Sequence, residues 1–241
     1  MLRFLLILVL AGTTLAAEPD WTAYDELLST HVTTGEKDGV PVNLVDYQGF
    51  AGDPGLDIAL TQIRNFDLSQ LQSNEEKLAY YINAYNLLTI KLIIDHWPVD
   101  SIRDIGNFFR GPWDRVVLET SEDRLTLDDI EHDIIRSFGE ARIHFAVNCA
   151  SVSCPDLRRE AYRAEDLDSQ LEEQTVLFLS NPKGLQADAD NVRVSRIFDW
   201  YEDDFASYGG VENFVRQYRP ELQFDDLEAN LNYNWNLSTR R

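Results

Sequence analysis

Basic residues are scarce in this chain of 241 residues, which has 21 lysines and arginines against 42 aspartates and glutamates and a formal net charge of -21. The acidic residues are spread along the chain, and no cluster of basic residues stands out. A nucleic-acid groove or a site for an anionic membrane surface requires such a cluster. The composition therefore argues against nucleic acid as a partner and predicts a solvated acidic surface.

A long hydrophobic run of membrane-spanning length is also lacking. The first 17 residues, MLRFLLILVLAGTTLAA, have one basic residue, a short apolar stretch and then small residues, which is the pattern of a secretory signal peptide. The apolar stretch is shorter than the roughly 20 residues that span a bilayer, and no later segment supplies a stop-transfer signal. We expect residues 1–17 to be a signal peptide cleaved near residues 16–17, leaving a periplasmic or secreted chain with no stable membrane span.

Repeats, low-complexity segments and linkers rich in proline or serine do not occur either. Residues 18–241 are therefore predicted to form a single domain. Helical and strand patterns are intermixed without a regular strand–helix alternation, which favours an α+β fold over a doubly wound sheet. We expect a buried central helix packed on a small, mainly antiparallel sheet, with further helices around them.

The central helix is predicted over residues 74–96. Ser73 and Glu76 form a capping box at its start, Pro98 ends it, and its residues are apolar on nearly every face. Asn83 and Asn86 share one face of this helix. Because a buried amide needs partners, we interpret the two asparagines as a polar network that ties the helix to a loop; the alternative is that they line a binding cleft.

Cysteine is nearly absent, and both cysteines fall in one segment, IHFAVNCASVSCPDL, together with His144. RIHFAVNC is predicted to be a strand, from which His144 and Cys149 would point to opposite faces. They form a nucleophile and base pair only if the chain turns at Asn148, which the small and polar residues that follow permit. In that arrangement Cys149 is the nucleophile, His144 the base, and Asn148 or Asn83 an orienting group. Such a site suits a thiol-dependent hydrolase or acyl transferase acting on peptide-like or amide substrates.

The alternative is a disulfide between Cys149 and Cys154, because an even pair of cysteines in an exported protein is first a candidate disulfide. The chain would then be a non-catalytic domain that binds a small molecule, a peptide or a protein. A zinc site of His144, the two cysteines and Asp156 lacks a recognised spacing, and H-E-x-x-H is absent. No metal or cofactor is therefore expected.

Four ordered segments carry a resemblance to a family. EKLAYYINAYNLLTI, LTLDDIEHDIIR, IHFAVNCASVSCPDL and VSRIFDWYEDDF, closed by YNWNLS, together resemble the family known as domain of unknown function 547, over most of the chain that follows the predicted signal peptide. The resemblance supplies no activity. It implies that the following residues occupy the motif positions of the family: Asn83, Asn86, Glu131, His132, His144, Asn148, Cys149, Ser151, Cys154, Pro155, Phe198 and Trp200. We assign Glu131, His132, Ser151 and Cys154, with the two helix asparagines, to the cleft or its polar network.

Overall fold

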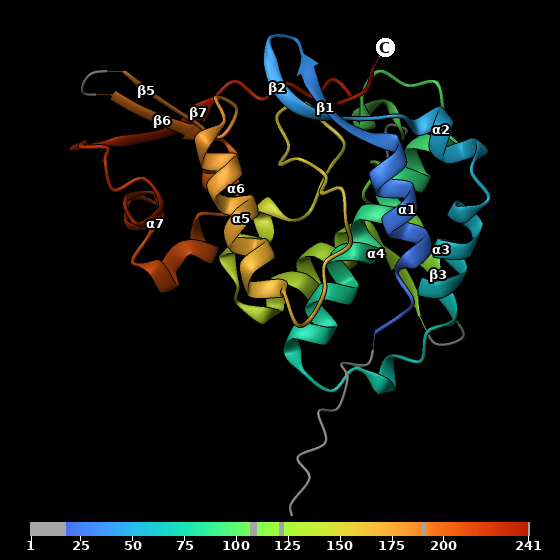
Figure 1. Ribbon diagram of the computed structural model, residues 1–241. Coiled ribbons are helices and arrows are strands. Elements are labelled where there is room, and N and C mark those ends of the chain that lie inside the picture. Colours follow the sequence, from blue (N-terminus) through green and yellow to red (C-terminus); the bar gives the residue numbers. More distant parts are fainter. Residues whose placement is uncertain (1–17, 107–109, 121–122, 189–190, 241) are drawn as a thin grey trace, which may run out of the picture.

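The computed structural model describes residues 18–106, 110–120, 123–188 and 191–240, so the predicted signal peptide lies outside the described residues. Helices and small sheets are intermixed along the chain, which confirms the α+β prediction. Figure 1 shows helices α1 to α4 on one side of the molecule, and α5, α7 and the strands β5 to β7 on the other. Among the described residues, no helix is both long and apolar enough to span a membrane.

The helices of the first side are α1 (Thr22–His31), α2 (Tyr47–Gly52), α3 (Gly55–Asn65) and α4 (Asn74–Asp95), with the short 3₁₀ helices η1 (Leu68–Gln70) and η2 (Ile102–Asp104). Those of the later chain are the π-helix η3 (Asp129–Ile135), the 3₁₀ helices η4 (Arg136–Phe138), η5 (Ala141–Phe145) and η6 (Glu202–Tyr208), and the α-helices α5 (Leu167–Ser180), α6 (Ile197–Trp200) and α7 (Val211–Tyr218).

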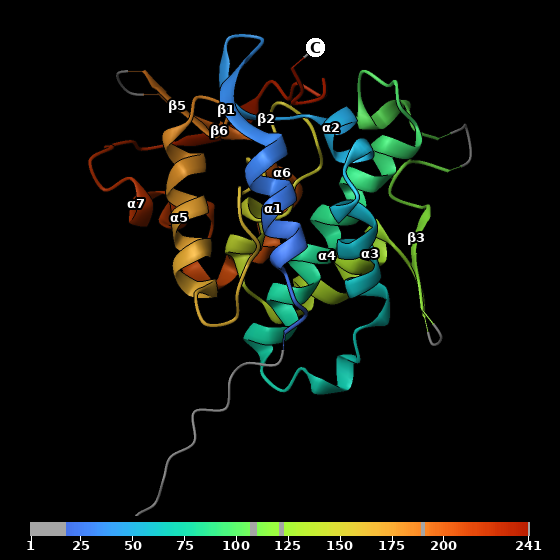
Figure 2. The same ribbon diagram turned by 45° about the vertical axis from the view of Figure 1, so that its right-hand side comes forward.

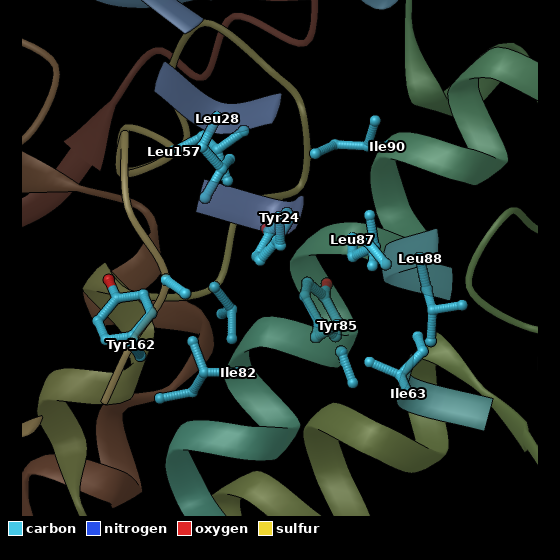
Figure 3. Close-up of a cluster of buried hydrophobic side chains, with 14 of the residues drawn as sticks. Tyr24, Leu28, Ile63, Ile82, Tyr85, Leu87, Leu88, Ile90, Leu157 and Tyr162 are labelled. Carbon is cyan, nitrogen blue, oxygen red and sulfur yellow. The ribbon is translucent and has the colours of Figure 1, made fainter. Parts of the chain in front are cut away.

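Helix α4 has the predicted capping box and the predicted central position. The Ser73 hydroxyl accepts a hydrogen bond from the Glu76 amide at 3.0 Å, and the Glu76 carboxylate accepts one from the Ser73 amide at 3.0 Å. Buried residues occur on nearly every face of the helix. Figure 3 shows why: side chains of α4 meet Tyr24 and Leu28 of α1, Ile63 of α3, and Leu157 of a later loop in one core.

The strands form three small sheets in place of the one expected. In the first two, β1 (Val32–Lys37) pairs with β2 (Val40–Val45) and β3 (Val116–Glu119) with β4 (Arg124–Thr126), both antiparallel. The third contains β5 (Leu185–Asp188), β6 (Asn191–Ser195) and β7 (Leu227–Leu231). Strands β5 and β6 are antiparallel, and β6 and β7 are parallel. Figure 2 shows the β1–β2 hairpin and the β3 arm at separate edges of the molecule.

A second hydrophobic core holds the later helices together. Phe145, Phe178, Phe198, Phe205 and Phe214 are all buried there. The ring of Phe145 lies 5.1 Å from that of Phe178 and 5.8 Å from that of Phe214, between centroids. Such aromatic pairs contribute about 0.5–1.5 kcal/mol beyond the area that they bury. This core fixes η5, which bears His144, against η6.

The predicted strand RIHFAVNC is wrong: residues 141–145 form the 3₁₀ helix η5, and a turn follows. No neighbouring strand pairs with this segment among the described residues. Instead it joins the two cores, because Ile143 packs in the first and Phe145 in the second. A helical turn spreads consecutive side chains in different directions, so both can be buried in different cores while His144 takes a third direction.

Candidate active site

A cavity of about 330 Å³ contains most of the candidate residues. His144, Cys149 and Cys154 line it, and so do Glu131 and His132 of η3. Its aromatic wall consists of Tyr85, Trp113, Trp200, Tyr201, Tyr233 and Trp235. Residues that are far apart in the sequence therefore meet around one space.

The loop that bears the cysteines is anchored to α4 by Asn86. The Asn86 side chain accepts a hydrogen bond from the Asn148 amide at 2.8 Å and donates one to the Ala146 carbonyl at 3.0 Å. The Asn148 side chain in turn accepts from the Ala150 amide at 2.9 Å and donates to the Pro155 carbonyl at 2.6 Å. Asn148 thus closes its own loop, and the chain turns there, as a pairing of His144 with Cys149 requires.

Backbone strain marks the residue after the cysteine. Ala150 has a φ of 67°, in the left-handed region that residues other than glycine rarely adopt. The bond from its amide to Asn148 and the bond from the Ser238 amide to its carbonyl, at 2.9 Å, hold it there. Strain of this kind persists only where the surroundings fix the backbone, and it is found preferentially at functional sites.

A later segment of the chain secures the other side of the loop. The Val152 amide donates to the Asn236 carbonyl at 2.8 Å, and the Ser153 amide to the Asn234 carbonyl at 3.2 Å. The Ser153 hydroxyl accepts a bond from the Asn234 amide at 2.8 Å. These contacts also place the neighbouring Tyr233 against the cysteine.

Cys149 and Cys154 are free, so the disulfide considered from the sequence is not formed. The sulfur of Cys154 instead accepts a hydrogen bond from the backbone amide of Cys149 at 2.8 Å. The sulfur of Cys149 lies 3.4 Å from both the Ser151 hydroxyl and the Tyr233 hydroxyl. Each cysteine is thus held as a separate thiol by its own set of contacts.

The two thiols differ in acidity. A hydrogen bond from the Cys154 thiol, with further bonds from Ser151 and Tyr233, lowers the pKa of Cys149 to about 7, even though burial opposes the shift. Burial raises the pKa of Cys154 well above its usual value. The negative charge therefore resides on Cys149, and a thiolate is the reactive form of cysteine.

His144 is fixed by a carboxylate. Its Nε2 lies 2.7 Å from Asp204 Oδ2, and its ring stacks on Tyr201 with 4.0 Å between centroids. Arg136 donates two hydrogen bonds to Asp204, at 2.7 and 2.8 Å, and these, with the bond to His144, keep the pKa of Asp204 below its usual value. Burial lowers the pKa of His144. His144 is therefore neutral at pH 7 and, because an ionised carboxylate only accepts, carries its proton on Nε2.

This tautomer leaves Nδ1 of His144 as a base. No hydrogen bond to Nδ1 is formed within the described part of the chain, and the side chain lines the cavity that Cys149 also lines. A neutral imidazole nitrogen in such a place accepts a proton from a thiol or from a water molecule. Covalent thiol chemistry needs a nucleophile and a base, and the side chains of Cys149 and His144 line one cavity.

Helix η3 presents Glu131 and His132 to the same cavity. Glu131 Oε1 accepts a hydrogen bond from the Tyr201 hydroxyl at 2.7 Å. His132 Nδ1 accepts one from Arg136 at 2.9 Å, and its Nε2 lies 3.4 Å from Asp128. Arg136 thereby connects His132 with the Asp204–His144 pair.

Asn83 lies apart from this cavity. Its side chain accepts a hydrogen bond from the Tyr162 amide at 2.8 Å and donates one to the Tyr162 carbonyl at 2.9 Å. Asn83 and Asn86 therefore use the same amide chemistry to fasten two different loops to α4, and only the Asn86 bond reaches the cysteine loop.

Sequence reasoning did not single out Arg136, Tyr201, Asp204 or Tyr233. All four lie in or beside segments whose patterns drew attention: Arg136 ends IEHDIIR, Tyr201 and Asp204 lie in FDWYEDDF, and Tyr233 begins YNWNLS. No spacing rule distinguishes Asp204 from its acidic neighbours, so the pattern of FDWYEDDF indicated the segment but not the residue. Among the described residues, no group of three or more histidines, cysteines and carboxylates is placed to hold a metal ion.

Fold and site together define an α+β protein with a cysteine and a histidine in one aromatic cavity. Residues 68–179 match the model of the family described as protein of unknown function, DUF547, and the chain carries a domain of this family. The matched region includes Glu131, His144 and Cys149, but it ends before Asp204 and Tyr233. No curated protein and no solved structure matches the chain.

Proposed function

We propose that this protein is a thiol-dependent hydrolase or acyl transferase that acts on peptide-like or amide substrates, in the periplasm or after secretion. The observation that carries the proposal is that Cys149 and His144 line one cavity while Nε2 of His144 is hydrogen-bonded to Asp204. The acidity of the Cys149 thiol supports it, because a thiol with a pKa of about 7 is about half ionised at neutral pH and gives up its proton readily to a nearby base.

The reaction has two halves. In the first, the Cys149 sulfur attacks the carbonyl carbon of the substrate, and Nδ1 of His144 takes the thiol proton. The resulting imidazolium is stabilised by Asp204 and returns the proton to the leaving nitrogen as the carbon–nitrogen bond breaks, which leaves a thioester on Cys149. In the second half, water or an amine attacks the thioester, His144 accepts a proton from it, and the proton returns to the Cys149 sulfur as the carbon–sulfur bond breaks.

The remaining groups have supporting roles in this proposal. Asp204 takes the orienting role that the sequence suggested for Asn148 or Asn83, since it contacts His144 directly and both asparagine amides are bonded to backbone. Tyr233, with its hydroxyl 3.4 Å from the Cys149 sulfur, is positioned to donate a hydrogen bond to the carbonyl oxygen as that oxygen gains negative charge.

An activated ester tests the proposal without knowledge of the natural substrate. With p-nitrophenyl acetate, the wild-type protein should release nitrophenol repeatedly and carry acetyl on Cys149. Cys149→Ala should show neither acetylation nor turnover. His144→Asn should release one equivalent rapidly and then stop, because the thiolate still attacks the activated ester while hydrolysis of the thioester loses its base and slows about a hundredfold or more.

The matched control is His96→Asn, the same substitution at a histidine that lies at the end of α4 and does not line the cavity. It should behave as the wild type. Asp204→Asn should slow turnover about tenfold or more, as is usual when the partner that orients a functional histidine is lost. Turnover by Cys149→Ala at the wild-type rate, or acetylation only at other residues, would contradict the proposal.

A further inference from the structure

The cavity around Cys149 has an unusual charge distribution. Three carboxylates line it, those of Asp114, Asp128 and Glu131, and no lysine or arginine does so among the described residues. Asp114 and Asp128 are exposed, whereas Glu131 is only 6% exposed. The cavity is therefore acidic both at its rim and in its wall.

Glu131 is buried, and no lysine or arginine of the described residues forms an ion pair with its carboxylate. Its carboxylate accepts hydrogen bonds from the neutral hydroxyls of Tyr201, at 2.7 Å, and Tyr85. Within the described chain no lysine or arginine forms an ion pair with it: Arg136 lies within electrostatic range, but its nitrogens are bonded to Asp204 and His132. Burying a charge is costly unless an opposite charge accompanies it. A cation in the cavity would supply that charge.

The aromatic wall offers a cation a second kind of contact. Trp235 is 6.0 Å from Trp113, 5.8 Å from Trp200 and 4.6 Å from Tyr233, between ring centroids. The guanidinium of Arg103, which does not line the cavity, lies 5.1 Å from the centroid of Trp235. This cluster thus already attracts a positive group at one ring, and the electron-rich faces of tryptophan are the strongest of the natural cation–π partners.

We propose that the cavity selects substrates that carry an alkylammonium group, with the ammonium held between Glu131 and the tryptophans. This inference rests on the proposed function, for it names the chemical class of the substrate on which Cys149 acts. An alkylammonium fits better than a quaternary ammonium because its N–H groups can bond to the Glu131 carboxylate. Asp114 and Asp128 attract the cation at the rim, an effect that salt screens.

Binding can be measured separately from catalysis in the Cys149→Ser variant, by titration calorimetry. The probes are cadaverine, its uncharged diol analogue, its dicarboxylate analogue and Nα-acetyllysine methylamide. Cadaverine and the lysine derivative should bind at least about tenfold more tightly than the diol, and the dicarboxylate should not bind. Tighter binding of the lysine derivative would assign the cation to a peptide, and tighter binding of cadaverine to a free amine.

Glu131→Gln removes the charge and keeps the size of the side chain, and it should weaken cadaverine binding about tenfold. Asp133→Asn is the matched control, because Asp133 lies on the same helix but is exposed and does not line the cavity. If Glu131→Gln does not fold, the double variant Asp114→Asn, Asp128→Asn is decisive: it should bind cadaverine at least about threefold more weakly at low salt.

Equal binding of cadaverine and the diol, or unchanged affinity in every folded carboxylate variant, would overturn the inference. If cadaverine binds no more tightly than the diol while Cys149 is acetylated normally in the wild type, the inference about the cation site is overturned and the proposed thiol chemistry is not. Selective amine binding in a protein whose Cys149 is never acetylated would overturn the proposed thiol chemistry and leave the cation site standing.

Discussion

The asparagines Asn83 and Asn86 provide a paired test of how the fold positions the reactive thiol. Both are almost completely buried on α4, and each makes two hydrogen bonds to the backbone of a loop. Asn86 holds the cysteine loop and Asn83 holds the loop at Tyr162. Replacing each with alanine changes the same residue type on the same helix, but only Asn86→Ala releases the segment that bears Cys149.

The expected loss of stability follows from the groups left without partners. Asn86→Ala leaves the Ala146 carbonyl and the Asn148 amide unsatisfied, and Asn83→Ala leaves the amide and carbonyl of Tyr162 unsatisfied. One buried polar group without a partner costs about 1–3 kcal/mol, so each variant should lose about 2–6 kcal/mol of its free energy of unfolding. Urea unfolding followed by circular dichroism measures this loss.

The two variants should differ in the chemistry of Cys149. The contacts that lower its pKa come from Cys154, Ser151 and Tyr233, and they depend on the loop conformation that Asn86 anchors. The pH midpoint for alkylation of Cys149 by iodoacetamide should therefore rise in Asn86→Ala from about 7 toward the ordinary value near 8.5. It should stay at about 7 in Asn83→Ala. Equal shifts in both variants, or no shift in Asn86→Ala despite its lower stability, would refute this reasoning.

Two further predictions concern the thiol pair and the start of the chain. Cys154→Ala should raise the alkylation midpoint of Cys149, because the hydrogen bond from the Cys154 thiol is the largest of the effects that lower the pKa of Cys149; a midpoint that stays at about 7 would show that Ser151 and Tyr233 suffice. If residues 1–17 are a signal peptide, the exported protein should begin at Ala17 or Glu18 by amino-terminal sequencing, and a chain that keeps Met1 would contradict that expectation.

Local signals in the sequence predicted the elements whose conformation local physics determines. Ser73 and Glu76 specify the start of α4 through their own side chains, and an all-round apolar composition is sufficient to place that helix in the core. The turn at Asn148 also follows from local chemistry, since its amide oxygen bonds to the Ala150 amide two residues later.

The conformation of residues 141–145 could not be read from the same signals. A short apolar run suits a strand or a buried helical turn equally well, and the decision depends on what lies beside it. Here two cores lie on different sides, and Ile143 and Phe145 enter one each. The role of Asp204 could not be predicted from the sequence for a related reason. It contacts His144, 60 residues earlier in the chain, through the packing of η6, and no local sequence pattern indicates such a contact.

The hydrogen bonds between the cysteine loop and residues 234–238 have a consequence for biosynthesis. Ser153 is bonded to Asn234, which follows it by 81 residues in the chain. A growing polypeptide can bury much of α4 against α1 and α3 long before Asn234 is made, yet its thiol loop lacks this support until then. Chains interrupted or clipped between the two segments would retain a hydrophobic core and a cysteine without the tyrosine that contacts it. The hydrogen bond from Tyr233 to Cys149 should therefore form only after residues 233–238 have been synthesised and have packed against the cysteine loop.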